Sequence, residues 1–162
     1  ADKVQKYNIA WFEEPIHGFD FRGYGELTES CPVPVAAGES VRNHYMFTPY
    51  LDAGVHHFQP VPSSFAGVWE WMQVRDMAVR SGIRFSSGGL PLLACPLIAT
   101  AGDEAMEEFL EVCNQPVLDC MEVTVQRRDG KFYLPDIPGL PFRLDMKWLK
   151  KNGYLLSYER YS

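Results

Sequence analysis

The chain has 162 residues, of which 46% are hydrophobic and 22% are charged, and its formal net charge at pH 7 is −6. This is the composition of an ordinary globular protein, and the length allows one domain with a core of its own. The acidic balance argues against nucleic acid or an anionic membrane surface as a partner, and no apolar run reaches the roughly 18 residues of a membrane helix. The four cysteines form no CxxC pair, so we expect reduced thiols and a cytoplasmic protein.

Strand-like and helix-like segments alternate along the first two thirds of the chain. Short apolar runs predict five strands, at residues 7–12, 33–37, 55–59, 83–87 and 108–112. Amphipathic or apolar stretches between them predict helices at residues 21–31, 41–53, 66–80 and 92–101. The predicted strand ends recur every 22 to 27 residues, which is the period of βα units in a parallel sheet. Without a Gly-rich phosphate loop, this pattern favours a barrel over a dinucleotide-binding sheet.

The pattern changes after Val125. Residues 126–134 predict a hairpin that turns at Asp129-Gly130, residues 145–151 predict a short helix, and an aromatic tail runs to Ser162. We therefore expect a partial barrel over residues 1–125 and a C-terminal segment over residues 126–162 that packs back on the barrel or its cap. A complete (β/α)8 barrel takes about 250 residues, so five units predict that the first strands of the barrel are absent from this chain.

Two glutamates stand just beyond the first two predicted strands. Glu13 lies in the segment Trp-Phe-Glu-Glu-Pro at residues 11–15, and Glu39 lies 26 residues later in Pro-Val-Ala-Ala-Gly-Glu-Ser at residues 34–40. The carboxyl ends of parallel strands open onto one face, so the two carboxylates should converge there. Converging carboxylates repel each other unless a cation lies between them, which predicts half of a site for a hard metal ion.

Six segments in a consistent order carry a resemblance to a known family. They are residues 11–15 and 34–40, Gln-Pro at 59–60 with Ala-Gly-Val at 66–68, Ser-Ser at 86–87, Glu-Phe-Leu-Glu at 108–111, and Leu-Pro-Asp-Ile-Pro-Gly-Leu at 134–140. Together they resemble the C-terminal half of the barrel domain in the enolase superfamily, within the mandelate racemase and muconate lactonizing enzyme group that includes acid-sugar dehydratases. The resemblance implies an α/β fold that is the C-terminal part of a (β/α)7β barrel.

The resemblance also implies a chemistry. Glu13 and Glu39 match family ligands of Mg²⁺, whose charge stabilises the enediolate formed when the proton α to a carboxylate leaves. Glu111 matches the glutamate of the last strand, which donates a hydrogen bond to the substrate carboxylate. The family's third Mg²⁺ ligand, its lysine motif and its capping domain have no match in these residues, and all would precede Ala1.

The chain departs from the family at two further positions. A racemase-type acid–base pair needs an aspartate after Gln59-Pro60 and a histidine after Ser86-Ser87, but Val61 and Gly88 stand there. Three alternatives remain open: a lysine from the absent half abstracts the proton, a nearby residue such as His17 substitutes, or the protein no longer catalyses this chemistry. The structural alternatives are a surface histidine at His17 and, at Glu14, a polar loop residue or ion-pair partner. One of His56 and His57 should be a buried core histidine.

The expected function is Mg²⁺-dependent dehydration of a sugar acid to a 2-keto-3-deoxy acid. An epimerase, racemase or cycloisomerase is the alternative within the superfamily, and a non-catalytic barrel used for assembly or binding is the alternative outside it. The expected partners are a small hydroxy-carboxylate substrate, a second copy of the protein and the N-terminal half of the barrel. The 162 residues alone should be inactive, and their unpaired outer strands should make them associate.

Overall fold

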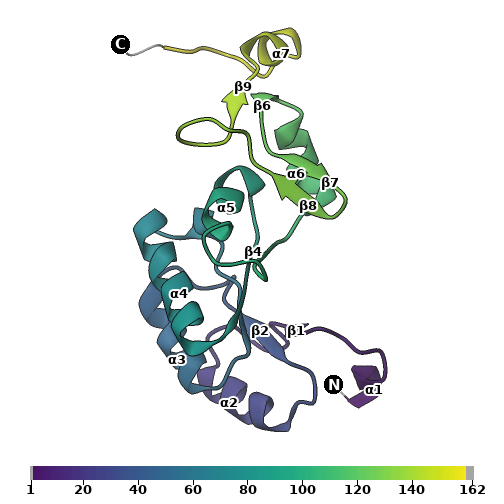
Figure 1. Ribbon diagram of the computed structural model, residues 1–162, viewed down its shortest axis with the longest axis vertical. Helices are drawn as coiled ribbons and strands as arrows, with labels where there is room; N and C mark the ends of the chain where they lie inside the picture. Colours follow the sequence, from purple (N-terminus) through teal and green to yellow (C-terminus); the bar gives the residue numbers. More distant parts are fainter. Residues whose placement is uncertain (1, 160–162) are drawn as a thin grey trace.

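The computed structural model describes residues 2–159 and contains a five-stranded parallel sheet (Figure 1). The strands follow one another in chain order as β1 Phe12–Glu13, β2 Val35–Ala37, β3 His57–Phe58, β4 Arg84–Ser87 and β5 Met106–Glu107. Each strand pairs in parallel with the next, so β1 and β5 form the two edges of this sheet. The curled sheet is half of a barrel, which confirms the predicted fold class.

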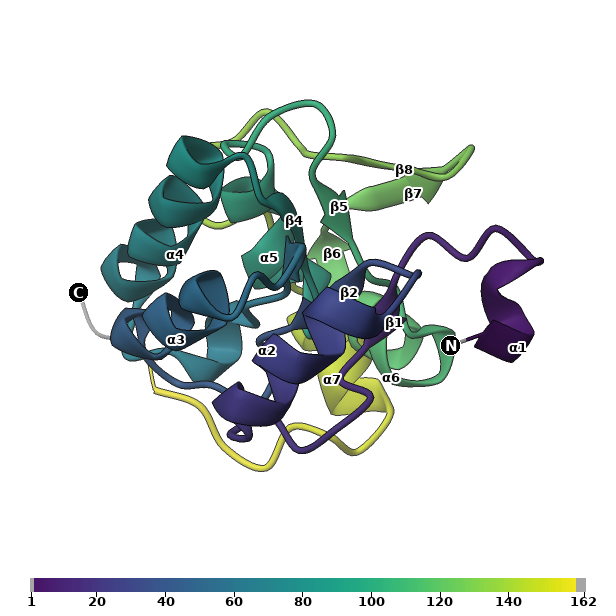
Figure 2. The ribbon, with the colours of Figure 1, turned by 90° about the horizontal axis from the view of Figure 1, so that it is seen from below.

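Helical segments connect successive strands and cover the outer face of the sheet (Figure 2). They are α2 Phe21–Ser30, the short helix η1 His44–Met46 with α3 Phe47–Asp52, η2 Pro62–Ser64 with α4 Val68–Ser81, and α5 Pro91–Ile98. A four-residue helix, α1 Asp2–Gln5, precedes β1. None of the helices within residues 2–159 is both long and apolar enough to cross a membrane.

Local interactions set the ends of these helices. Helix α2 begins where the Asp20 carboxylate accepts a hydrogen bond of 2.9 Å from the backbone N–H of Gly23, which satisfies one of the free donors of the first turn. Helix α4 ends at Gly82, whose φ of +66° lets the chain turn back into β4. The sequence pattern predicted both boundaries to within two residues.

The main core lies between the sheet and its helices. Val35, Ala37, Phe58 and Phe85 project from the strands into this layer. They meet fully buried side chains of the helices, namely Tyr24, Phe47, Tyr50, Trp71, Val74 and Ala78. Because side chains alternate along a strand, the residues between them face the inside of the half-barrel. The hydrogen-bonded pair His57 and Ser86 lies on the inner face, and the outer face carries the core.

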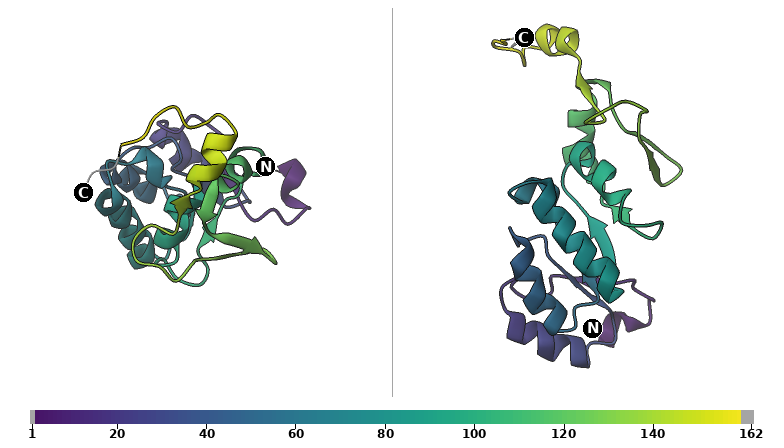
Figure 3. Two further views of the ribbon diagram at one scale, coloured as in Figure 1. Left: turned by 90° about the horizontal axis from the view of Figure 1, so that it is seen from above. Right: turned by 60° about the vertical axis from the view of Figure 1, so that its left-hand side comes forward.

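The C-terminal elements lie beyond α5, at the end of the molecule opposite α2 (Figure 3). Helix α6 Glu111–Leu118 leads to β6 Met121–Val123, which pairs antiparallel with β9 Arg143–Leu144, and α7 Met146–Lys151 follows. The predicted hairpin is confirmed as β7 Gln126–Arg128 and β8 Lys131–Tyr133. A second, smaller core joins α5, α6 and the start of this region through Leu92, Cys95, Leu118 and Val125. Residues 160–162 of the expected aromatic tail lie outside the described residues.

Three predicted elements are wrong. The first strand is residues 12–13, not 7–12. The fifth strand is residues 106–107, not 108–112, because α6 already begins at Glu111; there the Asn114 side chain accepts a 2.8 Å hydrogen bond from the Leu110 N–H. The predicted helix over 41–53 is shorter: residues 38–43 form a loop and helix begins only at His44, where the Asn43 side chain accepts a hydrogen bond from the N–H of Met46.

Candidate metal centre at the carboxyl ends of the strands

A small cavity opens at the carboxyl ends of the five strands, on the inner face of the half-barrel. Every strand contributes a residue at or just past its last position, so the cavity follows from the parallel topology. The lining residues are Glu13, Glu39, Gln59, Val61, Ser87, Gly88 and Glu108. The structure thus brings together both predicted metal ligands and both positions of the missing acid–base pair.

Glu13 ends β1 and is oriented by two side-chain donors. The amide Nε2 of Gln59 donates a hydrogen bond of 2.9 Å to Oε2 of Glu13, and Nε1 of Trp11 approaches the same oxygen at 3.5 Å. The other amide atom of the same residue, Gln59 Oε1, is buried and has no hydrogen-bond partner among the described residues. Both hydrogen bonds end on Oε2, and Oε1 of Glu13 has no hydrogen-bond partner among the described residues.

The surroundings of Glu39 change the pKa of its carboxyl group. Burial raises the pKa of its carboxyl above the ordinary value, and the negative charges of Glu13, Glu108 and Glu14 raise it further, against a small opposing effect of Arg42. No Lys, Arg or His belongs to the described residues that line the cavity. The carboxylates therefore repel each other across the cavity, and a cation placed there would relieve the repulsion.

The donor set fits a hard divalent cation in part. Mg²⁺ prefers oxygen ligands in octahedral geometry and keeps several waters, so two carboxylates can contribute to its site without completing it. Glu13 and Glu39 are such donors. Within residues 2–159, however, no group of three or more His, Cys, Asp or Glu side chains converges closely enough to enclose a metal ion. The remaining ligands would have to come from water, substrate or residues outside this half-barrel.

The two positions of the missing acid–base pair also line the cavity. Val61 is only 8% exposed, and its Cγ1 atom would lie 2.7 Å from a Cβ added at Gly89. A Cβ at Gly88 would lie 2.9 Å from Oε2 of Glu108. Val61 stands at the position of the expected aspartate, and the Glu108 carboxylate fills the space beside Gly88, the position of the expected histidine. Neither Val61 nor Gly88 offers a side-chain group that exchanges a proton.

The structure corrects the position of the last glutamate. Glu111 lies in the first turn of α6, where its carboxylate accepts a 2.6 Å hydrogen bond from Arg127 at the surface, and it does not line the cavity. Glu108 follows β5 directly and takes the place predicted for Glu111. Its backbone N–H donates to the carbonyl of Ser87, which continues the ladder between β4 and β5. The resemblance pointed to Glu111 because the last strand was expected over residues 108–112, which placed Glu111 near its end.

His17 lies apart from the cavity. It is exposed in the loop between β1 and α2, and its Nδ1 accepts a 3.3 Å hydrogen bond from the N–H of Phe19. The ring packs against Phe19 with the centroids 5.6 Å apart. His17 does not belong to the residues that line the cavity, so the geometry agrees with its interpretation as a loop histidine.

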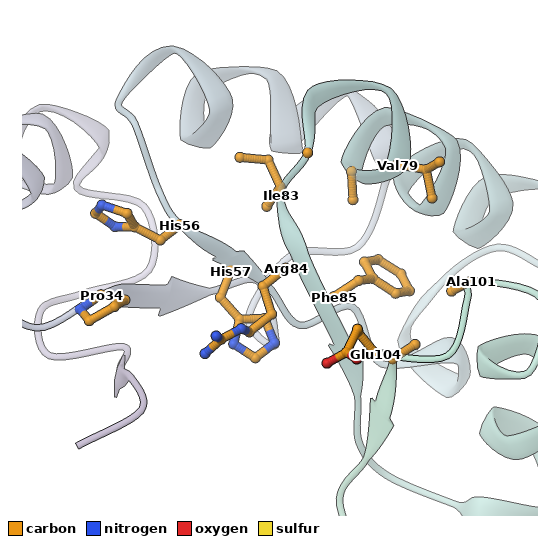
Figure 4. A pocket seen from close by; sticks show the side chains of 12 residues that line it. Pro34, His56, His57, Val79, Ile83, Arg84, Phe85, Ala101 and Glu104 are labelled. Atoms are coloured by element: carbon orange, nitrogen blue, oxygen red, sulfur yellow. The ribbon is translucent and has the colours of Figure 1, made fainter. Parts of the chain in front are cut away.

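A larger cavity of about 590 Å³ lies at the opposite ends of β3 and β4 (Figure 4). His57 contributes to it and is fully buried, with its Nε2 2.8 Å from Oγ of Ser86 and its ring edge-on to Trp11. Burial, and then the charge of Arg84, lowers the pKa of His57 to about 4. His57 is therefore a neutral histidine inside the barrel, as expected, while His56 is exposed and accepts a hydrogen bond from the Val35 N–H.

Comparison with known proteins shows which family this fold belongs to. Residues 1–148 match the family model described as enolase C-terminal domain-like. L-talarate/galactarate dehydratase of Salmonella typhimurium is 26% identical over 145 residues, which are 88% of this chain and 35% of the relative. D-galactarolactone cycloisomerase of Agrobacterium fabrum is 31% identical over 85 residues, which are 52% of this chain and 22% of that relative.

A solved structure shows the same fold. L-talarate dehydratase of Polaromonas, crystallised with Mg and L-glucarate, superposes with a TM-score of 0.79 at 20% identity and covers 90% of this chain and 40% of its own. The chain thus spans about a third of its first curated relative and two fifths of this structure. The family match, the curled parallel sheet and the relatives' sugar-acid activities agree, and the chain belongs to the enolase C-terminal domain-like family, in the mandelate racemase and muconate lactonizing enzyme group.

Proposed function

We propose that the protein containing this chain dehydrates a sugar acid in a Mg²⁺-dependent reaction that begins with removal of the proton α to the carboxylate. The observation that carries the proposal is the cavity at the strand ends, where Glu13, Glu39 and Glu108 meet without a basic side chain among the described lining residues. The curated relatives named as dehydratases of galactarate, rhamnonate and galactonate support the substrate class.

In this proposal Glu13 and Glu39 hold the metal ion, and Gln59 keeps Glu13 turned toward it. The ion supplies positive charge that offsets the negative charge developing on the substrate when the α-proton leaves. Glu108 faces the same cavity and hydrogen-bonds the substrate carboxylate. The proton-abstracting group and the remaining metal ligands come from barrel strands that pair with the open edges of β1 and β5.

The missing acid–base pair limits the mechanism. Because Val61 and Gly88 cannot exchange a proton, acid–base chemistry beside them is left to Glu108, to water or to the substrate itself. A base on the opposite side of the barrel suffices for abstraction followed by loss of a β-hydroxyl. Cycloisomerisation is the second candidate, since the relative named as a cycloisomerase is 31% identical over 85 residues, about half of this chain.

Substitution of Glu39 tests the proposal. In the intact protein, Glu39→Gln should abolish Mg²⁺-dependent formation of 2-keto acid from a panel that includes galactarate, rhamnonate and galactonate. Glu29→Gln, at an exposed position of α2, is the matched control and should retain full turnover. Turnover that survives Glu39→Gln would overturn the proposed metal site. A wild-type protein that converts none of these acids, with or without Mg²⁺, would favour cyclic lactone substrates or the non-catalytic alternative.

A further inference from the structure

Glu14 connects the loops that carry the two candidate metal ligands. It directly follows Glu13, and its carboxylate reaches across to the loop after β2. Oε1 accepts hydrogen bonds of 3.2 Å from the backbone N–H groups of both Gly38 and Ser40, and Oε2 accepts one of 2.9 Å from Oγ of Ser40. Gly38 and Ser40 come directly before and after Glu39, so the three hydrogen bonds hold the loop on both sides of this candidate ligand.

The backbone at Glu14 is unusual in the same place. Its φ is +30°, a conformation that few residues other than glycine adopt, and Pro15 follows it. Its N–H donates to the carbonyl of Ala36, which extends the pairing of β1 and β2 by one residue. A strained residue persists only where its surroundings stabilise it, and such residues cluster at functional sites. Here the side-chain hydrogen bonds to the neighbouring loop supply that stabilisation.

The loop that Glu14 holds needs an external support. Gly38 has a φ of +133°, and a Cβ there would lie 2.7 Å from the Phe47 ring, so the chain makes a sharp turn just before Glu39. Among the described residues, no hydrogen bond is found for the carboxylate of Glu39 itself. Its position in the cavity therefore depends on the backbone of its own loop, and that backbone is bonded to Glu14.

We propose that Glu14 is a positioning residue: it locks the loop of Glu39 to the end of β1 and thereby sets the separation of the Glu13 and Glu39 carboxylates for a divalent cation. The proposal rests on the proposed function. Residues that orient metal ligands in this way commonly contribute a factor of 10 to 100 in metal affinity. Glu14 does not contact the cation in this arrangement, because its own two oxygens are occupied by the loop.

Glu70 provides a matched control. It is also a partly buried glutamate that connects two segments 26 residues apart, because its Oε2 lies 3.2 Å from the N–H of His44 and 2.6 Å from His44 Nδ1. It lies at the start of α4 and does not line the cavity. Removal of either glutamate breaks a connection of similar kind, but only the connection made by Glu14 includes a candidate metal ligand.

The test measures the Mg²⁺ dissociation constant of the intact protein by titration calorimetry, together with its melting temperature without metal. Glu14→Ala should weaken Mg²⁺ binding by about tenfold or more. Glu70→Ala should lower the melting temperature and leave Mg²⁺ binding unchanged. Glu14→Gln should recover binding to within about threefold of wild type, because the amide oxygen can still accept from both N–H groups while its NH2 donates to Ser40.

Each other outcome overturns the proposal. Unchanged Mg²⁺ binding in Glu14→Ala excludes a positioning role, and an equal loss in Glu70→Ala makes the effect one of general stability. An equal loss in Glu14→Gln and Glu14→Ala assigns the effect to charge. If Glu14→Ala fails to fold, Ser40→Ala removes one bond only and should weaken binding by about threefold, and unchanged binding there overturns the proposal.

Glu39→Gln separates this proposal from the proposed function. If wild type binds Mg²⁺ and Glu39→Gln does not, the metal site stands and Glu14 is judged on its own variants. If wild type and Glu39→Gln bind Mg²⁺ equally, the metal site and the role of Glu14 are both wrong. Hydrogen exchange of the metal-free protein gives a further readout, since Glu14→Ala should speed exchange of the N–H groups of Gly38 and Ser40.

Discussion

Gln59 on the loop after β3 donates a hydrogen bond of 2.9 Å to Glu13 at the end of β1, across the intervening strand β2. One layer deeper, His57 and Trp11 repeat the relationship, with their rings 4.7 Å apart. Side chains from alternate strands share a layer inside a β/α barrel, so these pairs are what a curled sheet produces and a flat sheet does not. The orientation of Glu13 is thus a product of barrel curvature.

Loss of the Gln59 amide should weaken the metal site. Gln59→Leu removes the donor but keeps a side chain of similar size, so Glu13 becomes free to rotate, and the affinity of the intact protein for Mg²⁺ should fall by about tenfold. Titration calorimetry measures the change. Gln126→Leu, at an exposed position of the β7–β8 hairpin, should have no effect. Equal affinities in Gln59→Leu and wild type would show that Glu13 needs no such support.

The sequence predicted the parts of the site that follow strictly from topology. Apolar runs with a regular period implied parallel strands, and Glu13 and Glu39 follow the first two of these, so their convergence could be inferred without coordinates. The role of Glu14 could not be inferred. It depends on a backbone φ of +30° and on a side chain that crosses to another loop, and neither leaves a periodic signal.

The last strand shows why spacing alone misplaces a residue. Three glutamates, at 107, 108 and 111, follow one another closely, and the choice among them depends on where the strand ends. The strand is only two residues long, and its register places Glu107 opposite Ser87. Glu107 lies with Cys95 and Ile98 of helix α5, Glu108 lines the strand-end cavity, and Glu111 starts a helix. A shift of one residue turns a side chain to the other face of the sheet, so the average spacing of the strands cannot decide which glutamate faces the cavity.

The two glycines of the β4 loop should differ in their tolerance of a side chain. Gly89 has a φ of +91° and a Cβ there would lie 2.7 Å from Val61, so Gly89→Ala should cost about 2 kcal/mol of unfolding free energy. The one close contact of a Cβ at Gly88 is with Oε2 at the end of the flexible Glu108 side chain, at 2.9 Å, so Gly88→Ala should cost less than about 1 kcal/mol. Urea unfolding of the two variants measures the difference. A larger loss for Gly88→Ala would contradict this packing.

Glu107 should make the stability of the protein depend on pH. Burial, and then the charge of Glu108, raises the pKa of its carboxyl from 4.5 to about 8, and both oxygens are buried without a partner among the described residues. Between these values the folded state retains a proton that the unfolded chain releases. The contribution of Glu107 to stability should therefore be fully present below pH 4.5, fall by up to about 1.4 kcal/mol per pH unit as the pH rises toward 8, and level off above it.

Glu107→Gln tests this dependence, because the amide is neutral at every pH. The unfolding free energy of the variant minus that of wild type should increase steadily from pH 5 to pH 8. Glu104→Gln is the control, since Glu104 is exposed on the same connection. Parallel stability curves for wild type and Glu107→Gln would mean that the carboxyl finds a partner or water in solution.

Glu108, not Glu111, should contribute to turnover in the intact protein. Glu108 lines the cavity with Glu13 and Glu39, so Glu108→Ala should remove a hydrogen bond to a charged substrate and lower kcat/KM by about tenfold to a hundredfold. Glu111→Ala removes only a surface ion pair with Arg127, which is worth less than about 1 kcal/mol, and turnover should be unchanged. The two variants remove the same carboxylate group from positions that are three residues apart, so steady-state kinetics on one sugar acid compares them directly. A loss confined to Glu111→Ala would mean that β5 is shifted by three residues in the working enzyme, which would place Glu111 in the cavity.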